Sequence, residues 1–201
     1  MADVARDETT IREAWAAGDF TLATTHALRL YGPEVLGYLV TFQKDHDSAG
    51  DAFSLFSQRL WETLPAFEWR CSLRTWCYRL ARNAAIDMQR SDTRRREVGL
   101  SSAPEVLALA ARTRTETLSA LRTAKRTALE ELRDGLSEED RTMLVLRVDR
   151  QLDWREIAVV MDATKSGLAE DDVTREAARL RKRFQLVKDR LRSLARERGI
   201  R

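Results

Sequence analysis

The spacing of hydrophobic residues is the most informative feature of this sequence. Through most of the chain they recur at every third or fourth position, which is the repeat of one face of an α-helix. Between Thr9 and Phe42 the pattern predicts two or three helices, interrupted at Gly18 and at the pair Gly32 and Pro33. We therefore expect helices to build the first part of the chain.

Two further helices are predicted before residue 96. Ser48 or Asp51 can cap a helix that ends before Pro65, and Ser72 can cap another that runs to about Arg90. The short segment between them is aromatic and is expected to be a loop.

Residues 97–117 are predicted to be a flexible linker, in which residues 105–117 could form an isolated helical turn or two. The sequence around their start is rich in arginine, serine and glycine, and Arg112 to Glu116 has no convincing apolar face. This divides the chain into a first domain of residues 1–96 and a second domain of residues 118–201.

The second domain is predicted to open with a helix over residues 118–133, closed by Gly135. Ser137 and the three acidic residues after it form an N-terminal signature, because the serine caps the helix and the acids favour its dipole. A second helix is expected to start there.

A helix-turn-helix with an extended loop is predicted to follow. Asp153 can cap a short helix over residues 154–161, and residues 162–171 then form a loop. The longest helical pattern in the chain runs from residue 172 to about 198, and its apolar stripe leaves several arginines on other faces.

Composition favours an all-α protein of two small helical domains. Of the 201 residues 43 % are hydrophobic, which is enough for buried cores, and only 8 glycines and 3 prolines are available for tight turns.

The net charge of +3 conceals two cationic blocks. Residues 61–96 hold 8 basic and 4 acidic side chains, and residues 172–201 hold 11 and 4, whereas the sequence before and between these blocks is acidic. Two separate positive blocks indicate two contacts with a polyanion, for which the phosphate backbone of nucleic acid is the natural candidate.

The C-terminal block has the features of a helix that reads duplex DNA. Arg175, Arg179, Lys182 and Arg183 share one broad helical face, and arginine can bond guanine edges while lysine contacts phosphate. The alternative is a solvated face on which Glu176 relieves the repulsion between neighbouring arginines.

The other cationic block alternates arginines with aromatic residues, a combination that suits unpaired bases. Trp61 and Trp76 fall on apolar stripes and are expected in the core. Phe67 and Trp69 are expected in the loop, where they are freer to touch a ligand.

Nothing in the sequence indicates an enzyme, a cofactor or a metal site. The two histidines, His26 and His46, have no triad or cluster partners, and no glycine-rich phosphate loop is present. Cys71 and Cys77 have no second pair and no nearby histidine, so we expect two thiols. The absence of a signal-like or membrane-length apolar run predicts a cytoplasmic protein without membrane insertion.

Four stretches resemble the extracytoplasmic-function (ECF) sigma factors of bacterial RNA polymerase. Residues 72–87 are similar to the promoter-melting helix, and residues 48–61 to the helix that docks on the clamp of the largest polymerase subunit, with Asp51, Arg59 and Trp61 in place. Residues 136–161 and 180–192 resemble parts of the domain that binds the upstream promoter element.

The resemblance implies a non-enzymatic initiation factor that binds the clamp and flap of core RNA polymerase, recognises promoter DNA and separates its strands. An inhibitory anti-sigma factor is a common partner in that family. The implied polymerase contacts lie on the docking helix: Asp51, Ser54, Leu55, Arg59 and Leu60. The implied contacts to the separated minus-ten strand surround the melting helix: Phe67, Trp69, Arg70, Arg74, Tyr78, Arg82 and Asn83. The implied contacts to the minus-thirty-five duplex lie on the last helix: Arg175, Arg179, Lys182 and Arg183.

The chain departs from the family pattern at two places. Ser54 and Leu55 stand where the family often has glutamine and glutamate, and the connection from Met161 to Val173 is longer than the usual tight turn. The longer connection implies a recognition helix that starts earlier or enters the groove at another angle.

Two other functions are compatible with the residues alone. A helix-turn-helix repressor or activator would bind DNA without being a polymerase subunit. A helical adaptor with basic faces for acidic proteins would bind promoter DNA no better than random duplex.

Overall fold

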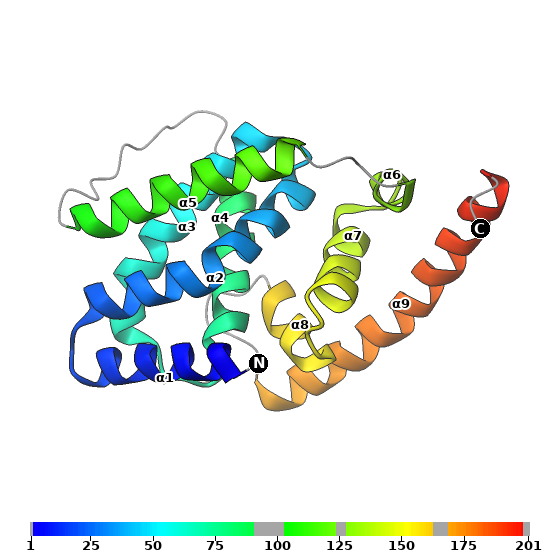
Figure 1. Cartoon of the computed structure of the whole chain (residues 1–201). Helices are drawn as coiled ribbons and strands as arrows, with labels where there is room; N and C mark the ends of the chain where they lie inside the picture. The colour runs from blue at the N-terminus through cyan, green and yellow to red at the C-terminus, as the bar shows by residue number, and fades with distance from the viewer. Residues whose placement is uncertain (1, 91–102, 124–127, 163–168, 199–201) are drawn as a thin grey trace. The chain divides into compact units, whose positions relative to one another are not determined.

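A computed structural model describes residues 2–90, 103–123, 128–162 and 169–198 of the chain. Every regular element in these residues is a helix, so the predicted all-α fold class is confirmed (Figure 1). The chain divides into two compact units, Met1–Thr123 and Ala124–Arg201.

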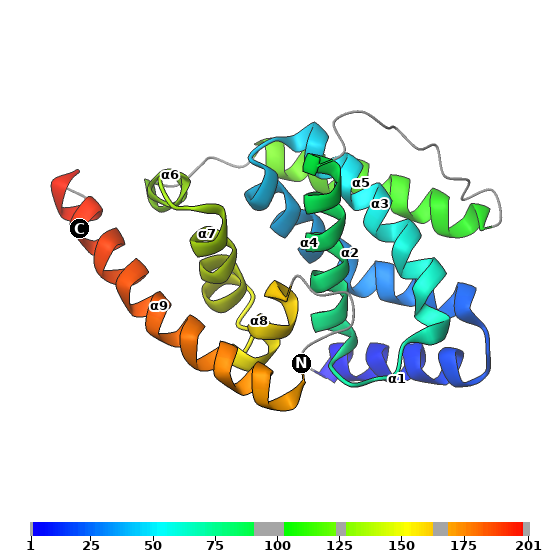
Figure 2. The same ribbon diagram turned by 180° about the vertical axis from the view of Figure 1, so that it is seen from behind.

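The first unit is built around its second helix. In chain order its elements are α1 (Ala2–Ala16), α2 (Phe20–Gln43), α3 (His46–Thr63), the 3₁₀-helix η1 (Leu64–Ala66), α4 (Leu73–Arg90) and α5 (Pro104–Thr123). Helix α2 packs against α1, α3, α4 and α5. Figures 1 and 2 show α5 and α4 on opposite sides of the α2–α3 pair.

Aromatic residues from three helices fill the core of this unit. Tyr38 of α2, Phe53 and Phe56 of α3 and Tyr78 of α4 are fully buried. The rings of Tyr38 and Tyr78 meet edge to face with centroids 5.5 Å apart, and those of Phe53 and Phe56 lie 5.6 Å apart. This core fixes α4 against α2 and α3.

One of the two predicted interruptions in the first helices is real. Gly18 follows α1 with a φ of 77°, a left-handed conformation that glycine adopts without strain. The predicted break at Gly32 and Pro33 is wrong, because α2 continues through Pro33 and tertiary packing on four neighbouring helices outweighs the lost hydrogen bond.

Three of the predicted helix starts are confirmed by their caps. The side chain of Ser72 accepts from the amide of Thr75, and that of Ser137 accepts from the amide of Asp140. Asp153 forms a full capping box with Glu156 at the start of α8 (Trp154–Met161).

The predicted cap of α3 is wrong. Asp45, not Ser48 or Asp51, is the cap, and its carboxylate accepts from the amide of Ser48 at 2.6 Å. Lys44 ends α2 in a left-handed conformation, so α3 starts only two residues later.

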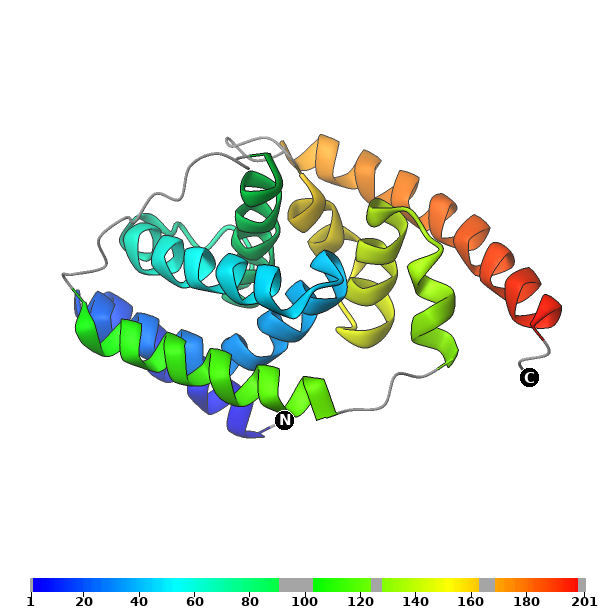
Figure 3. The same cartoon turned by 90° about the horizontal axis from the view of Figure 1, so that it is seen from above.

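The structure differs from the expected linker. Residues 104–117 belong to α5, which runs as one continuous helix along the outside of the first unit (Figure 3). Val106, Leu109, Ala110 and Thr113 are buried as α5 packs on α2 and α3. This stripe contains an alanine and a threonine, so it is too weakly apolar to stand out in the sequence; residues 97–102 lie outside the described residues.

The second unit also differs from the sequence pattern at its start. Its elements are α6 (Ala128–Asp134), α7 (Glu138–Leu144), the π-helix η2 (Val145–Asp149), α8 (Trp154–Met161) and α9 (Glu170–Glu197). The expected helix over residues 118–133 is replaced by the end of α5 and by α6, and residues 124–127 lie outside the described residues. Helix α9 starts two residues before the expected position, and residues 163–168 of the expected loop are also outside the description.

Helix α9 packs on α6, α7 and α8 through the predicted apolar stripe. Val173, Ala177, Leu180, Phe184 and Val187 are buried, and the ring of Phe184 lies 5.2 Å from that of Trp154 on α8. None of the helices in the described part of the chain combines the length and the apolar composition that a membrane crossing needs.

Candidate nucleic-acid interface

An aromatic cluster lies beside the start of α4. Phe67 stacks on Trp76 with 4.6 Å between ring centroids and lies 4.9 Å from Trp69. The edge of Trp15 meets Trp69 at 5.7 Å, and the guanidinium of Arg12 lies 4.3 Å from the ring centroid of Trp69. The two indoles of Trp69 and Trp76 are therefore oriented by packing before any ligand arrives.

The structure reverses two expectations about this cluster. Phe67 was expected to be free in the loop, but it is only 6 % exposed, because its amide bonds the carbonyl of Leu64 and folds the loop inward. Trp76 was expected in the core, but it is half-buried, as is Trp69. The accessible aromatic faces here belong to Trp69 and Trp76, and Phe67 supports them from below.

The expected contact of Tyr78 with a DNA strand is wrong. Tyr78 is fully buried, with the ring of Tyr38 on one side and the guanidinium of Arg74 5.6 Å from its ring centroid. It is a core residue that braces Arg74. Asn83, one turn further along α4, is half-buried.

The three arginines expected to contact DNA on α4 and in the loop before it are in different states. Arg70 is 82 % exposed and pairs with Glu68 at 2.7 Å. Arg74 donates two hydrogen bonds to Glu34, at 2.8 and 2.9 Å. Nε and Nη1 of Arg82 are buried and have no hydrogen-bond partner among the described residues, so an added phosphate or base acceptor would relieve an unfavourable burial.

The expected polymerase contacts lie on α3, but one of them is not accessible. Leu60 is fully buried in the core, so its expected contact with a partner is wrong. Leu55 is half-buried, and Arg59 pairs with Asp87 of α4 at 2.8 Å. Arg59 therefore ties α3 to α4.

Arg114 of α5 lies across the exposed part of this α3 face, and sequence reasoning missed it. Its Nη2 is 3.3 Å from Oδ1 of Asp51, and its Nη1 donates to Oγ of Ser54 at 3.4 Å. A Cβ built on Gly50 would come within 2.4 Å of Nε of Arg114, so a larger residue at this position would make the guanidinium shift. No local signal joins an arginine to a glycine more than sixty residues earlier.

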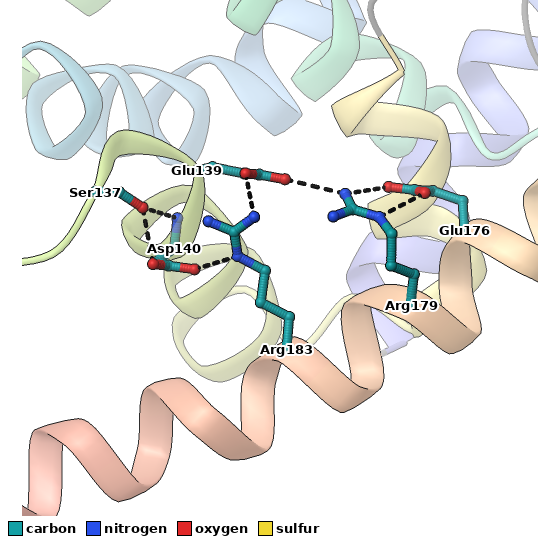
Figure 4. Close-up of polar contacts among 6 residues, drawn as sticks. All are labelled: Ser137, Glu139, Asp140, Glu176, Arg179 and Arg183. Carbon is teal, nitrogen blue, oxygen red and sulfur yellow. Dashed lines mark hydrogen bonds and ion pairs between the residues drawn. The ribbon is translucent and has the colours of Figure 1, made fainter.

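In the second unit, two of the expected DNA-reading arginines bond carboxylates (Figure 4). Arg179 donates to Glu176 at 2.6 and 2.8 Å and to Glu139 of α7 at 3.0 Å. Arg183 donates to Asp140 at 2.5 Å and also pairs with Glu139. Glu139 and Asp140 lie in the first turn of α7 and Glu176 lies on α9 itself, so the network joins α9 to α7.

The network affects the ionisation of its members. Burial opposes the charge on Asp140, but hydrogen bonds from Arg183 and Ser137 outweigh it, and the pKa of Asp140 lies below that of an ordinary carboxyl. Hydrogen bonds to Glu176 and Glu139 raise the pKa of Arg179, and the bond to Asp140 raises that of Arg183. All three groups are therefore charged at neutral pH.

The other two cations of α9 are more accessible. Arg175 is 78 % exposed and pairs with Asp172 at 3.0 Å within the same helix. Lys182 is exposed. Such an exposed pair is weak, so Arg175 is available to an external phosphate or base at little cost.

No other cluster in the described residues suggests chemistry. Among them, no group of three or more histidine, cysteine, aspartate or glutamate side chains could hold a metal ion. Cys71 and Cys77 are free cysteines, and burial raises the pKa of the Cys77 thiol. The interface consists of cations, aromatic rings and carboxylates.

Comparison with known proteins gives one match. Residues 27–95, which include α3, Phe67, Trp69, Trp76 and α4, match the family model for sigma-70 region 2. No curated protein and no solved structure matches the chain. The match identifies residues 27–95 as a sigma-70 region 2 domain, which implies a non-enzymatic sigma factor that binds core RNA polymerase for promoter recognition and strand opening.

Proposed function

We propose that the chain is a sigma factor of the ECF type, with one promoter-binding task in each unit. The first unit binds core polymerase through α3 and holds the separated minus-ten strand beside α4. The second unit binds the minus-thirty-five duplex through α9. The observation that carries the proposal is the pair of half-buried indoles, Trp69 and Trp76, next to arginines within the region 2 match.

Unpaired bases fit the surface beside α4. A flipped base costs a few kcal/mol to unstack, and stacking on an aromatic ring returns about 1 to 3 kcal/mol per base. Trp69 and Trp76 offer such rings, and Arg70, Arg74 and Arg82 offer positive charge for the backbone. Asn83 is the proposed polar contact to a base edge, whereas Phe67 and Tyr78 support the surface from inside.

Duplex DNA fits the surface of α9. The order α7, α8, α9 supplies a helix-turn-helix with a long basic last helix. Arg175 and Lys182 are the proposed first contacts because they are accessible. Arg179 and Arg183 contribute where DNA acceptors replace or join the carboxylates that now hold them.

Polymerase contacts are proposed on the exposed part of α3, at Asp51, Ser54, Leu55 and Arg59. Polymerase then holds both units on one promoter, so two modest DNA affinities act together. An anti-sigma factor is part of the proposal as an inhibitory partner.

Transcription from fragmented genomic DNA tests the proposal. Core polymerase is mixed with the full chain, and the 5′ ends of the transcripts are sequenced. The proposal predicts defined starts that share one motif about ten and another about thirty-five base pairs upstream, and the Arg175→Ala variant should relax only the upstream motif. Defined starts that share only the nearer motif would reject the role of the second unit.

A further inference from the structure

Helix α5 lies beside the part of α3 that carries two of the proposed polymerase contacts, Asp51 and Ser54, and leaves both of them partly exposed. Arg114 reaches Asp51 and Ser54, and its guanidinium fills the space left by Gly50. At the preceding position of α5, Thr113 lies against α2, where a Cβ built on Gly32 would come 3.2 Å from its Cγ2. Close approach at one glycine in each of two helices seats α5 at a defined place.

We propose that α5 is an internal cover of the docking face and must leave α3 before core RNA polymerase can bind there. The inference rests on the proposed assignment of Asp51 and Ser54 as polymerase contacts. A partner that binds Asp51 must bring a hydrogen-bond donor to its carboxylate, and Arg114 already supplies a charged one from within the chain. The Asp51 carboxylate cannot bond fully to Arg114 and to the polymerase at the same time, so the two compete for it.

The contacts that hold α5 differ in kind from those of α4. Its buried face consists of small and aliphatic side chains such as Val106, Ala110 and Leu118, whereas α4 contributes the fully buried ring of Tyr78. The contacts of Arg114 to Asp51 and Ser54, at 3.3 and 3.4 Å, are longer than a strong hydrogen bond.

Helices α3 and α5 also fail to close on each other along part of their length. An open groove of about 740 Å³ lies between them, and its walls include Asp47, Ser57, Val106, Ala110 and Leu118. An element held by few large apolar contacts opens at lower free energy than the core around it. The groove and the small side chains of its buried face make α5 a candidate to leave α3.

With the cover in place, the apparent affinity for polymerase equals the affinity of the open form multiplied by the fraction of molecules that are open. If about one molecule in ten is open, removal of the cover tightens the apparent Kd by about tenfold.

Hydrogen–deuterium exchange of the wild-type chain tests release directly and needs no variant. The proposal predicts faster exchange of the amides of residues 106–118 when saturating core polymerase is added, while α2 and α4 stay protected. Unchanged or stronger protection of α5 in the complex would overturn it.

Three variants test the affinity effect. Val106→Asp places a charge in the buried face of α5, and Arg114→Ala removes the contacts to Asp51 and Ser54. Both should bind core polymerase more tightly than wild type, by about tenfold for Val106→Asp and less for Arg114→Ala. Arg112→Ala, an exposed arginine of the same helix, is the matched control and should bind like wild type. Far-UV circular dichroism checks that each variant folds.

The outcomes separate this inference from the proposed function. If the wild-type chain does not bind core polymerase at all, the proposed function fails. The Asp51→Ala change is also made in the Val106→Asp variant. If this double variant binds core polymerase as tightly as Val106→Asp alone, the docking face is misassigned and the cover is rejected as well. If Asp51 matters but neither α5 variant binds more tightly, only the cover is rejected.

Discussion

The two cationic regions of this protein look alike in sequence and differ in structure. Around α4, arginines lie beside two half-buried indoles, and the acids that pair with them each serve one arginine. On α9, Arg179 and Arg183 share three carboxylates from α7 and α9. Among the described residues, neither arginine contacts a tryptophan ring. The α4 region presents aromatic rings together with arginines, whereas the α9 region presents arginines that are already paired with carboxylates.

The difference supports the proposed assignment of the two blocks to different forms of DNA. Aromatic faces gain most from bases that have left the stack, so the α4 region fits a separated strand. Carboxylates beside arginines reduce attraction to any phosphate, so the α9 region favours sites that offer well-placed acceptors over random duplex. The net charge of each block reveals neither the aromatic rings near α4 nor the carboxylates that pair with the arginines of α9.

The largest effect is expected from Tyr78→Ala, which tests whether this residue belongs to the core. Removal of a fully buried ring should cost about 3 to 5 kcal/mol of unfolding free energy, measured by urea denaturation. Tyr78→Phe is the matched control and keeps the ring. If the Tyr78→Ala protein is as stable as wild type, Tyr78 is not a core residue and its expected contact with DNA is reinstated.

A smaller effect is expected from Arg179→Ala on the α9 side. If Arg179 reads a base, affinity for the matching upstream element should fall by about 1 to 3 kcal/mol, and affinity for random duplex should fall much less. Arg192→Ala, an exposed arginine further along α9, controls for the lost charge. Equal losses on both duplexes, measured by fluorescence anisotropy, would reduce Arg179 to a phosphate contact or a structural ion pair.

Lys182→Ala should produce a weaker and less selective change. Loss of one phosphate contact should weaken binding to all duplexes alike and lower the slope of log K against log salt by about 1. The measurement is a salt titration of the affinity for matching and random duplexes. A change confined to the matching duplex would instead make Lys182 a base-reading residue.

The smallest effect concerns the pH dependence of the second unit. Because the pKa of Asp140 is lowered in the folded protein, its ionisation stabilises the fold above the pKa of the unfolded chain, about 3.9, and this contribution is lost as pH falls through the folded value. Asp140→Asn should therefore lose less stability than wild type when urea denaturation is repeated between about pH 4 and pH 2.5. Parallel losses in both proteins would show that the Arg183 contact does not carry the dependence.

Features set by neighbouring residues were predictable from the sequence. Ser72, Ser137 and Asp153 cap helices through bonds to amides two or three residues away, and the stripe of α9 follows from its own spacing. The cap of α3 was misplaced because Ser48 and Asp45 both have the right chemistry, and only the short connection from α2 decides between them.

Features set by distant residues were not predictable. Tyr78 lies between arginines in the sequence, and its burial depends on Tyr38, forty residues earlier. The arginines of α9 have few acids near them in the sequence, and those that bond Arg183 come from α7. Arg114 lies in a stretch with no clear apolar face, so neither α5 nor its contact with Asp51 could be foreseen.

Strand opening by the holoenzyme tests the central claim, that the rings beside α4 hold the separated strand. Permanganate oxidises unpaired thymines, so it reports opening of the minus-ten element on a promoter found by transcript sequencing. We predict that Trp69→Ala with Trp76→Ala keeps polymerase binding and upstream-element binding but loses most thymine reactivity, whereas Arg175→Ala at saturating holoenzyme keeps it. Wild-type reactivity in the double tryptophan variant would contradict the account.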